Sequence, residues 1–184
     1  NTLKSINLGN QEIYANLFTF IVNDKMFIGS YLKGLREFHD NDSITIAKGG
    51  SFYERKNIFS IVPLSGTQTL IVAAEGLYNY NQETGESQEF TNSYLKKLFG
   101  SSVPTRGQKL SNQQVGISTY VTEQPTFLTF NEQGKPIEIY NKDIGLQDSW
   151  VYSFFENTNS SLWLALDLGI SKVEIQSAFR KFDE

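Results

Sequence analysis

The stretch Trp150–Glu174, WVYSFFENTNSSLWLALDLGISKVE, decides the fold of this chain. In a strand over Val151–Glu156, Val151, Ser153 and Phe155 are expected to face one side and the other three residues the opposite side. A polar NTNS turn leads into the nearly continuous apolar run Leu162–Leu166. After a turn that ends in glycine, alternation returns over Ile170–Ile175. Alternation is typical of a strand with one covered face, and a continuous apolar run is typical of a strand covered on both faces. The stretch therefore predicts a three-stranded antiparallel meander, which needs neighbouring sheets to be stable.

The same pattern recurs along the chain. The segment WLALDLG resembles LIVAAEG and FIGSYLKG, and each copy is preceded by another strand pattern and followed by alternation. The bulky residue that opens each copy is expected in the core, and the glycine that closes it is expected at positive φ in a structural turn. The expected core residues are Phe27, Leu70 and Trp163, and the expected turn glycines are Gly34, Gly76 and Gly169.

The spacing of these copies is close to one fixed period. Leu77 follows Leu35 by 42 residues and Ile170 follows Leu77 by 93, about two periods, so a further copy is expected between them, over Pro125–Tyr140. A period of this size, made of short strands and glycine turns, is typical of β-propeller blades. The sequence predicts an all-β fold, a β-propeller segment of about four blades that are antiparallel meanders of three to four strands. The predicted repeats are residues 10–47, 55–90, 103–140 and 149–182.

A β-sandwich is the alternative, because its strands also come at regular spacing. A sandwich does not require the same glycine and the same preceding bulky residue in every period, and this favours the propeller. One segment departs from the strand patterns. Thr91–Phe99, TNSYLKKLF, begins with residues that can cap a helix and carries its apolar residues on one helical face. It predicts one short helix inserted in a loop.

The repeat resembles a known family. Gly145–Asp148, the pattern of Val151–Glu156, the run Leu162–Asp167 and the turn Gly169–Ser171 resemble the two-component regulator propeller repeat. The resemblance implies a periplasmic sensor domain of a bacterial signal-transduction protein, anchored in the membrane by other parts of its parent. It also implies that this chain is part of a longer protein, whose output domain is not among these residues.

Composition excludes several functions. The net charge is −4 and there is no basic run, which argues against a nucleic-acid partner. No apolar run approaches the roughly 18 residues of a membrane-spanning helix, so no membrane contact is expected in this segment. The absence of cysteine removes thiol catalysis and cysteine-ligated metals. The chain starts at Asn1 without methionine, which is expected of a piece cut from a longer protein.

No residue pattern predicts catalysis. The single histidine, His39, has no nucleophile motif to accompany it, and a histidine-based metal site lacks a second ligand. Asp40–Asp42 lacks the spacing of a calcium-binding loop. We therefore expect no catalytic residue, no metal and no cofactor.

Four residues are candidates for binding a ligand. Trp150 begins a strand beside a polar loop, and an exposed indole face suits the apolar face of a sugar ring. Tyr31, in a strand-end turn, and Arg55 and Arg106, near strand starts, accompany it by position. Packing or an ordinary surface role is the alternative for each of them.

Three functions follow from these observations. The first is a non-catalytic sensor that recognises a ligand such as a carbohydrate, or a neighbouring domain. The alternatives are a polysaccharide-acting propeller enzyme and a pure protein-interaction scaffold. An open arc of blades would also leave two unpaired edges, which predicts a homodimer through them. A self-closed, monomeric four-bladed ring is the alternative to that dimer.

Overall fold

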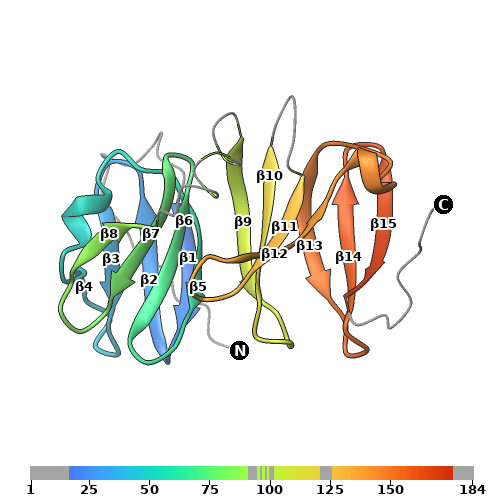
Figure 1. Ribbon diagram of the computed structural model, residues 1–184. Coiled ribbons are helices and arrows are strands. Elements are labelled where there is room, and N and C mark those ends of the chain that lie inside the picture. The colour runs from blue at the N-terminus through green and yellow to red at the C-terminus, as the bar shows by residue number, and fades with distance from the viewer. Residues whose placement is uncertain are drawn as a thin grey trace, which may run out of the picture. The chain divides into compact units, whose positions relative to one another are not determined.

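A computed structural model describes residues 17–90, 95, 97, 99, 102–120 and 126–175 (Figure 1). The described strands form four antiparallel sheets, each of three or four strands. The chain divides into two compact units, Asn1–Phe90 and Thr91–Glu184, and each unit is described by itself below. The predicted short helix lies mostly outside the described residues. Within it, Leu95 and Lys97 are helical, and the Phe99 N–H donates a hydrogen bond to the Leu95 carbonyl over 2.8 Å.

The first unit holds two sheets, each with its strands in chain order (Figure 1). The strands of the first sheet are β1 (Leu17–Val22), β2 (Lys25–Ser30), β3 (Gly34–Phe38) and β4 (Ile44–Ile46). A short 3-10 helix, η2 (Gly50–Tyr53), leads to the second sheet. The strands of the second sheet are β5 (Ile58–Pro63), β6 (Gln68–Ala73), β7 (Gly76–Asn81) and β8 (Ser87–Glu89).

The second unit also holds two sheets of consecutive strands (Figure 1). The strands of the first are β9 (Val103–Lys109), β10 (Val115–Tyr120), β11 (Phe127–Phe130) and β12 (Pro136–Tyr140). The 3-10 helix η3 (Lys142–Ile144) precedes the other sheet. The strands of that sheet are β13 (Val151–Glu156), β14 (Ser161–Leu166) and β15 (Gly169–Glu174). Every sheet is a simple meander, so the predicted all-β fold of antiparallel three- and four-stranded sheets is confirmed.

In the first unit, the two sheets share one apolar core. Phe27 and Leu35 on β1–β4 belong to the same buried cluster as Ile58 and Ile71 on β5–β8. The two backbones approach closely, because a Cβ on Gly29 would lie only 3.2 Å from Ile58 Cβ. Phe27 and Leu70 are both buried, as predicted. Stacking of one sheet on the next is how blades cover their apolar faces.

In the second unit, the contact between the two sheets depends on two aromatic rings. Phe127 on β11 and Phe154 on β13 meet edge to face, with their ring centroids 4.8 Å apart. A Cβ at Gly116 would come within 2.9 Å of Phe127 and 3.3 Å of Phe154, so a residue without a side chain makes room for both rings. Leu162 and Leu164 on β14 complete this side of the core.

Strands β5 and β13 share an irregularity. Ile58 pairs with Ala73 and Ser60 with Val72, so Phe59 is an extra residue in the ladder. The same shift occurs between Val151 and Ser153 of β13, which makes Tyr152 the extra residue there. A bulge of this kind leaves one residue unpaired and re-aims its side chain, and the pairing resumes in a shifted register on the other side of it.

Two of the predicted turn glycines show why glycine is needed. Gly34 has φ +69°, and a Cβ there would lie 2.4 Å from the Gly50 carbonyl oxygen. Gly169 has φ +118° and opens β15 directly after the turn from β14. Gly76 also has a positive φ, of +145°, so the predicted backbone conformation of all three glycines is confirmed.

The prediction that Trp163 lies in the core is wrong. Leu162, Leu164 and Leu166 of β14 are buried, but Trp163 is 42% exposed and Ala165 is exposed as well. Sheet β9–β12 covers the leucine face of β14, whereas within the described part of the unit no sheet covers the tryptophan face. The apolar run is therefore a strand with one covered face and one open apolar face.

No helix among the described residues is long and apolar enough to cross a membrane.

Candidate functional site

Three aromatic side chains of the second unit lie together at the strand ends. We call Tyr120, Trp150 and Tyr152 the aromatic cluster. The ring centroids of Tyr120 and Trp150 are 4.5 Å apart and their planes are tilted by 47°. Tyr152 meets Trp150 edge to face, with a centroid distance of 6.4 Å. Both tyrosines are exposed and Trp150 is partly buried, so the cluster presents ring faces and edges to solvent.

The fold explains how these rings come together. Tyr120 ends β10, and Trp150 directly precedes β13, the strand that packs on β10. Tyr152 is the extra residue of the β13 bulge, and a side chain at such a position points away from the regular ladder. Tyr120 and Trp150 are 30 residues apart in the sequence. They form one surface because the end of β10 lies beside the start of β13.

Asp167 gives the aromatic cluster a polar edge. It lies in the turn between β14 and β15, and its Oδ1 accepts a hydrogen bond from the Tyr152 hydroxyl over 2.9 Å. This bond is the main reason that the pKa of Tyr152 is raised above its ordinary value, because an ionised phenol could no longer donate to the carboxylate. The negative charge of Asp167 acts in the same direction.

The charge of a second carboxylate, that of Asp148, also acts on this tyrosine. Asp148 is buried, accepts a hydrogen bond from the Ser149 N–H over 2.6 Å, and faces the Lys142 ammonium at 3.5 Å. Its charge is near enough to raise the pKa of Tyr152 slightly further. The cluster therefore combines apolar rings with a hydroxyl and carboxylate oxygens, which can accept and donate hydrogen bonds around a ring-shaped, hydroxylated ligand.

The structure brings together two of the other predicted ligand residues. In the first unit, the Arg55 N–H donates a hydrogen bond to the Tyr31 carbonyl over 2.6 Å, and both side chains are exposed. Arg106 belongs to the second unit, where it lies within β9 opposite Ser118. Tyr31, Arg55 and Arg106 stay predictions as ligand-binding residues.

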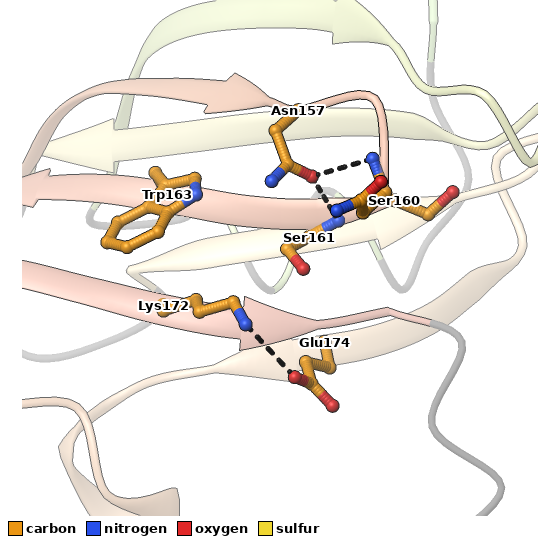
Figure 2. A pocket seen from close by; sticks show the side chains of 7 residues that line it. Asn157, Ser160, Ser161, Trp163, Lys172 and Glu174 are labelled. Atoms are coloured by element: carbon orange, nitrogen blue, oxygen red, sulfur yellow. Dashed lines mark hydrogen bonds and ion pairs between the residues drawn. The ribbon is translucent and has the colours of Figure 1, made fainter.

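A hollow of about 420 Å³ lies on β13–β15 (Figure 2). None of the residues that line it belongs to the aromatic cluster. The Trp163 ring forms one wall, and the ion pair between Lys172 and Glu174, 3.1 Å apart, forms another (Figure 2). The Asn157 side chain accepts hydrogen bonds from the backbone of its own turn and fixes the end of the hollow (Figure 2). The residues that line the hollow are Asn157, Asn159, Ser160, Ser161, Trp163, Lys172 and Glu174.

Among the residues that the structure describes, no group of three or more His, Cys, Asp or Glu side chains is placed to hold a metal ion.

The sequence identified one member of the aromatic cluster and missed three partners. Trp150 was singled out by its place between a polar loop and a strand. Tyr120, Tyr152 and Asp167 give no comparable signal in the sequence. Each belongs to a different strand or turn, and only the packing of the sheets brings them together. The repeat predicts where strands begin and end. A search for aromatic residues near those predicted strand ends could have found both tyrosines.

Comparisons with known proteins bear on the fold. No family model matches the sequence, and no curated protein sequence matches it. Among solved structures, the chain is similar to the extracellular domain of BT3049 from B. thetaiotaomicron, described as a hybrid two-component system. The TM-score is 0.70 at 12% identity, over 95% of this chain and 23% of that one.

Two further structures are similar. The extracellular domain of BT4673 from B. thetaiotaomicron, also described as a hybrid two-component system, matches with a TM-score of 0.63 at 14% identity, over 88% of this chain and 22% of that one. The WD40 β-propeller domain of Doa1 matches with a TM-score of 0.60 at 12% identity, over 86% of this chain and 50% of that one.

At such identities the likeness concerns the fold. The chain spans less than a quarter of the length of the two extracellular domains. The described residues form a β-propeller segment of four antiparallel sheets, and at the level of the fold the comparisons agree with the resemblance to the two-component regulator propeller.

Proposed function

We propose that this chain is a non-catalytic segment of an extracellular signalling propeller, and that its aromatic cluster, together with Asp167, contacts a carbohydrate ligand. The proposed setting is the periplasmic side of a bacterial membrane, as part of a longer, membrane-anchored sensor. The fold-level likeness to extracellular domains of two-component systems supports this setting. The observation that carries the proposed ligand class is the packing of Trp150 between two exposed tyrosines beside an exposed carboxylate.

The chemistry of the cluster fits a sugar better than a flat apolar ligand. Aromatic rings at 4.5 Å and 6.4 Å spacing offer apolar area for the C–H groups of a pyranose ring. Asp167 has a second oxygen beyond the one that Tyr152 uses, so it can accept a hydrogen bond from a sugar hydroxyl. The Tyr152 hydroxyl keeps its acceptor capacity, because in this bond it is the donor.

The two tryptophans of the chain allow a direct test. Trp163→Phe leaves Trp150 as the single indole fluorophore, and Trp150→Phe leaves only Trp163. We expect a panel of oligosaccharides to contain at least one member that changes the emission of the Trp163→Phe protein in a saturable way. The same sugar is expected to leave the emission of the Trp150→Phe protein unchanged.

Substitutions in the cluster sharpen that test. Tyr152→Ala and Asp167→Asn are expected to weaken the response, whereas Phe18→Ala in the other unit serves as an exposed-aromatic control. A response that survives both cluster substitutions would contradict the assignment of the site. Cleavage of the bound sugar, followed by mass spectrometry, would contradict the non-catalytic part of the proposal and support a polysaccharide-acting enzyme.

A further inference from the structure

A carboxylate without a paired cation lies beside the aromatic cluster. Asp167 is exposed, and its Oδ1 accepts the hydrogen bond from the Tyr152 hydroxyl over 2.9 Å. None of the ion pairs among the described residues involves Asp167. A phenol is a neutral donor, so this bond orients the carboxylate and leaves its charge in place. The site therefore carries one exposed negative charge that a ligand can meet.

The other carboxylate near the cluster already has its partners. Asp148 is buried, accepts a hydrogen bond from the Ser149 N–H, and faces the Lys142 ammonium at 3.5 Å. The pKa of Tyr152 is raised first by its bond to Asp167 and further by the negative charges of both carboxylates. The charges around the exposed Tyr152 ring thus favour a positively charged ligand group, and Asp167 is the carboxylate that such a group can reach.

An amide oxygen faces the same turn. Gln147 is exposed, and a Cβ placed on Gly169 would lie 3.1 Å from its Oε1, so this oxygen rests against the β14–β15 turn. Gly169 is two residues after Asp167. Carboxylate and amide oxygens both accept hydrogen bonds. A ligand group with several donors can therefore be satisfied at this turn better than a group with one.

The aromatic rings strengthen the preference for a cation. The face of a tyrosine or tryptophan ring attracts an ammonium within roughly 6 Å of the ring centroid. The first unit shows this geometry within the chain itself, where Lys56 Nζ lies 4.5 Å from the centroid of the Phe52 ring. At the aromatic cluster, Trp150 and Tyr152 offer such rings, and Tyr152 is bonded directly to Asp167. One ammonium group can thus meet a ring and a carboxylate together.

We propose that the ligand of the aromatic cluster is an amino sugar, with its protonated amine against Asp167 and its ring on the aromatic side chains. This inference rests on the function proposed above and narrows the ligand to glycans with free ammonium groups. A protonated amine has three donors for the oxygens of Asp167 and Gln147. N-acetylation removes the charge and leaves one donor, and a uronic acid places a second carboxylate against Asp167.

The test compares matched oligosaccharides by titration calorimetry with the whole chain. The probes are trimers of glucosamine and of galactosamine, each with free or with N-acetylated amines, and a trimer of a uronic acid. At about pH 6, amines are charged and ordinary carboxyls are ionised. At least one free-amine trimer is expected to bind about tenfold more tightly than its acetylated form, and the uronic acid trimer is expected to bind most weakly. Added salt is expected to narrow the difference.

Three variants assign the preference to one carboxylate. Asp167→Asn keeps an acceptor oxygen and loses the charge, so the free-amine and acetylated trimers are expected to bind within about twofold of each other. Glu174→Gln removes an exposed negative charge elsewhere in the same unit and is expected to keep the tenfold preference. Tyr152→Phe keeps both the ring and the Asp167 charge, so it is also expected to keep the preference. Circular dichroism checks that each variant is folded.

The outcomes separate this inference from the proposed function. Equal affinity for free-amine and acetylated trimers, or a preference that survives Asp167→Asn, would overturn the amino-sugar assignment and leave carbohydrate binding in place. If 1,5-diaminopentane, an ammonium compound without a sugar ring, binds as tightly as the free-amine trimers, the surface is a general cation site and the assignment is wrong. Failure of every sugar to bind would contradict both proposals.

Discussion

The hydroxyl of Tyr80 donates a hydrogen bond to the carbonyl of Lys48 over 2.9 Å, which ties the end of β7 to the loop that follows β4. Tyr53 makes a similar bond to the Ser87 hydroxyl over 3.0 Å. Both phenols are buried, and burial raises the pKa of Tyr80 to about 12 and that of Tyr53 as well. Because of these two phenols, the stability of the first unit is expected to fall at alkaline pH.

The first prediction concerns that link. The folded pKa of Tyr80 is raised above the ordinary 10.0, so its contribution to stability is complete below pH 10 and is lost as the pH rises towards 12. The free energy of unfolding is expected to fall by up to about 1.4 kcal/mol per pH unit for each such phenol. Urea denaturation between pH 8 and 11.5 measures this slope. Tyr80→Phe is expected to reduce the slope of the unfolding free energy against pH. An unchanged slope would show that the raised pKa of Tyr80 does not cause it.

The second prediction compares two glycines with nearly the same backbone. Gly34 has φ +69° and Gly66 has φ +65°, so alanine meets similar conformational strain at both. Only at Gly34 would the new Cβ lie 2.4 Å from the Gly50 carbonyl oxygen, since nothing lies within 4 Å at Gly66. Gly34→Ala is expected to lower the free energy of unfolding by at least about 2 kcal/mol more than Gly66→Ala. Equal losses of unfolding free energy in the two variants would show that the backbone at Gly50 moves aside without an energetic cost.

The third prediction separates the two faces of the β13–β15 sheet. Phe154 is buried against Phe127, so Phe154→Ala is expected to cost about 3–5 kcal/mol of stability. Trp163 is 42% exposed, so Trp163→Ala is expected to cost less than about 1 kcal/mol of stability, measured by chemical denaturation. A loss as large as that of Phe154→Ala would place Trp163 in a core after all.

The fourth prediction concerns the contact between β13 and the turn after β9. Glu156 accepts a hydrogen bond from the Ser111 N–H over 2.8 Å and another from the Ser111 hydroxyl over 2.6 Å. Glu156→Ala is expected to cost about 1 kcal/mol, because two bonds to one carboxylate are lost. Glu174→Ala, which removes an exposed pair with Lys172, should cost less than about 0.5 kcal/mol. Thermal unfolding of both variants measures the difference.

Most of the fold could be predicted from local patterns. The alternation, the glycine turns and the period fix strand positions, because a pleated strand and a tight turn depend on neighbouring residues only. The exposure of Trp163 could not be predicted in this way. Leu70 and Trp163 occupy matching positions in similar apolar runs, yet Leu70 is buried and Trp163 is 42% exposed. Coverage is a property of the assembled sheets.

The candidate site shows the same limit. Trp150 stands out beside its polar loop, but its contacts with Tyr120 and Tyr152 depend on how β13 packs on β10. The register shift that turns Tyr152 outward is equally hidden, because a bulge is defined by a partner strand and not by the strand that carries it.

That bulge has a consequence for how binding chemistry can change. Tyr152, like Phe59 in β5, stands outside the pairs that hold its strand in register. Its side chain can be exchanged without altering which residues of β13 face the core, so affinity for the proposed carbohydrate ligand and stability of the sheet can vary independently at this position. Replacing Tyr152 with other side chains therefore offers a way to redirect recognition while the blade keeps its structure.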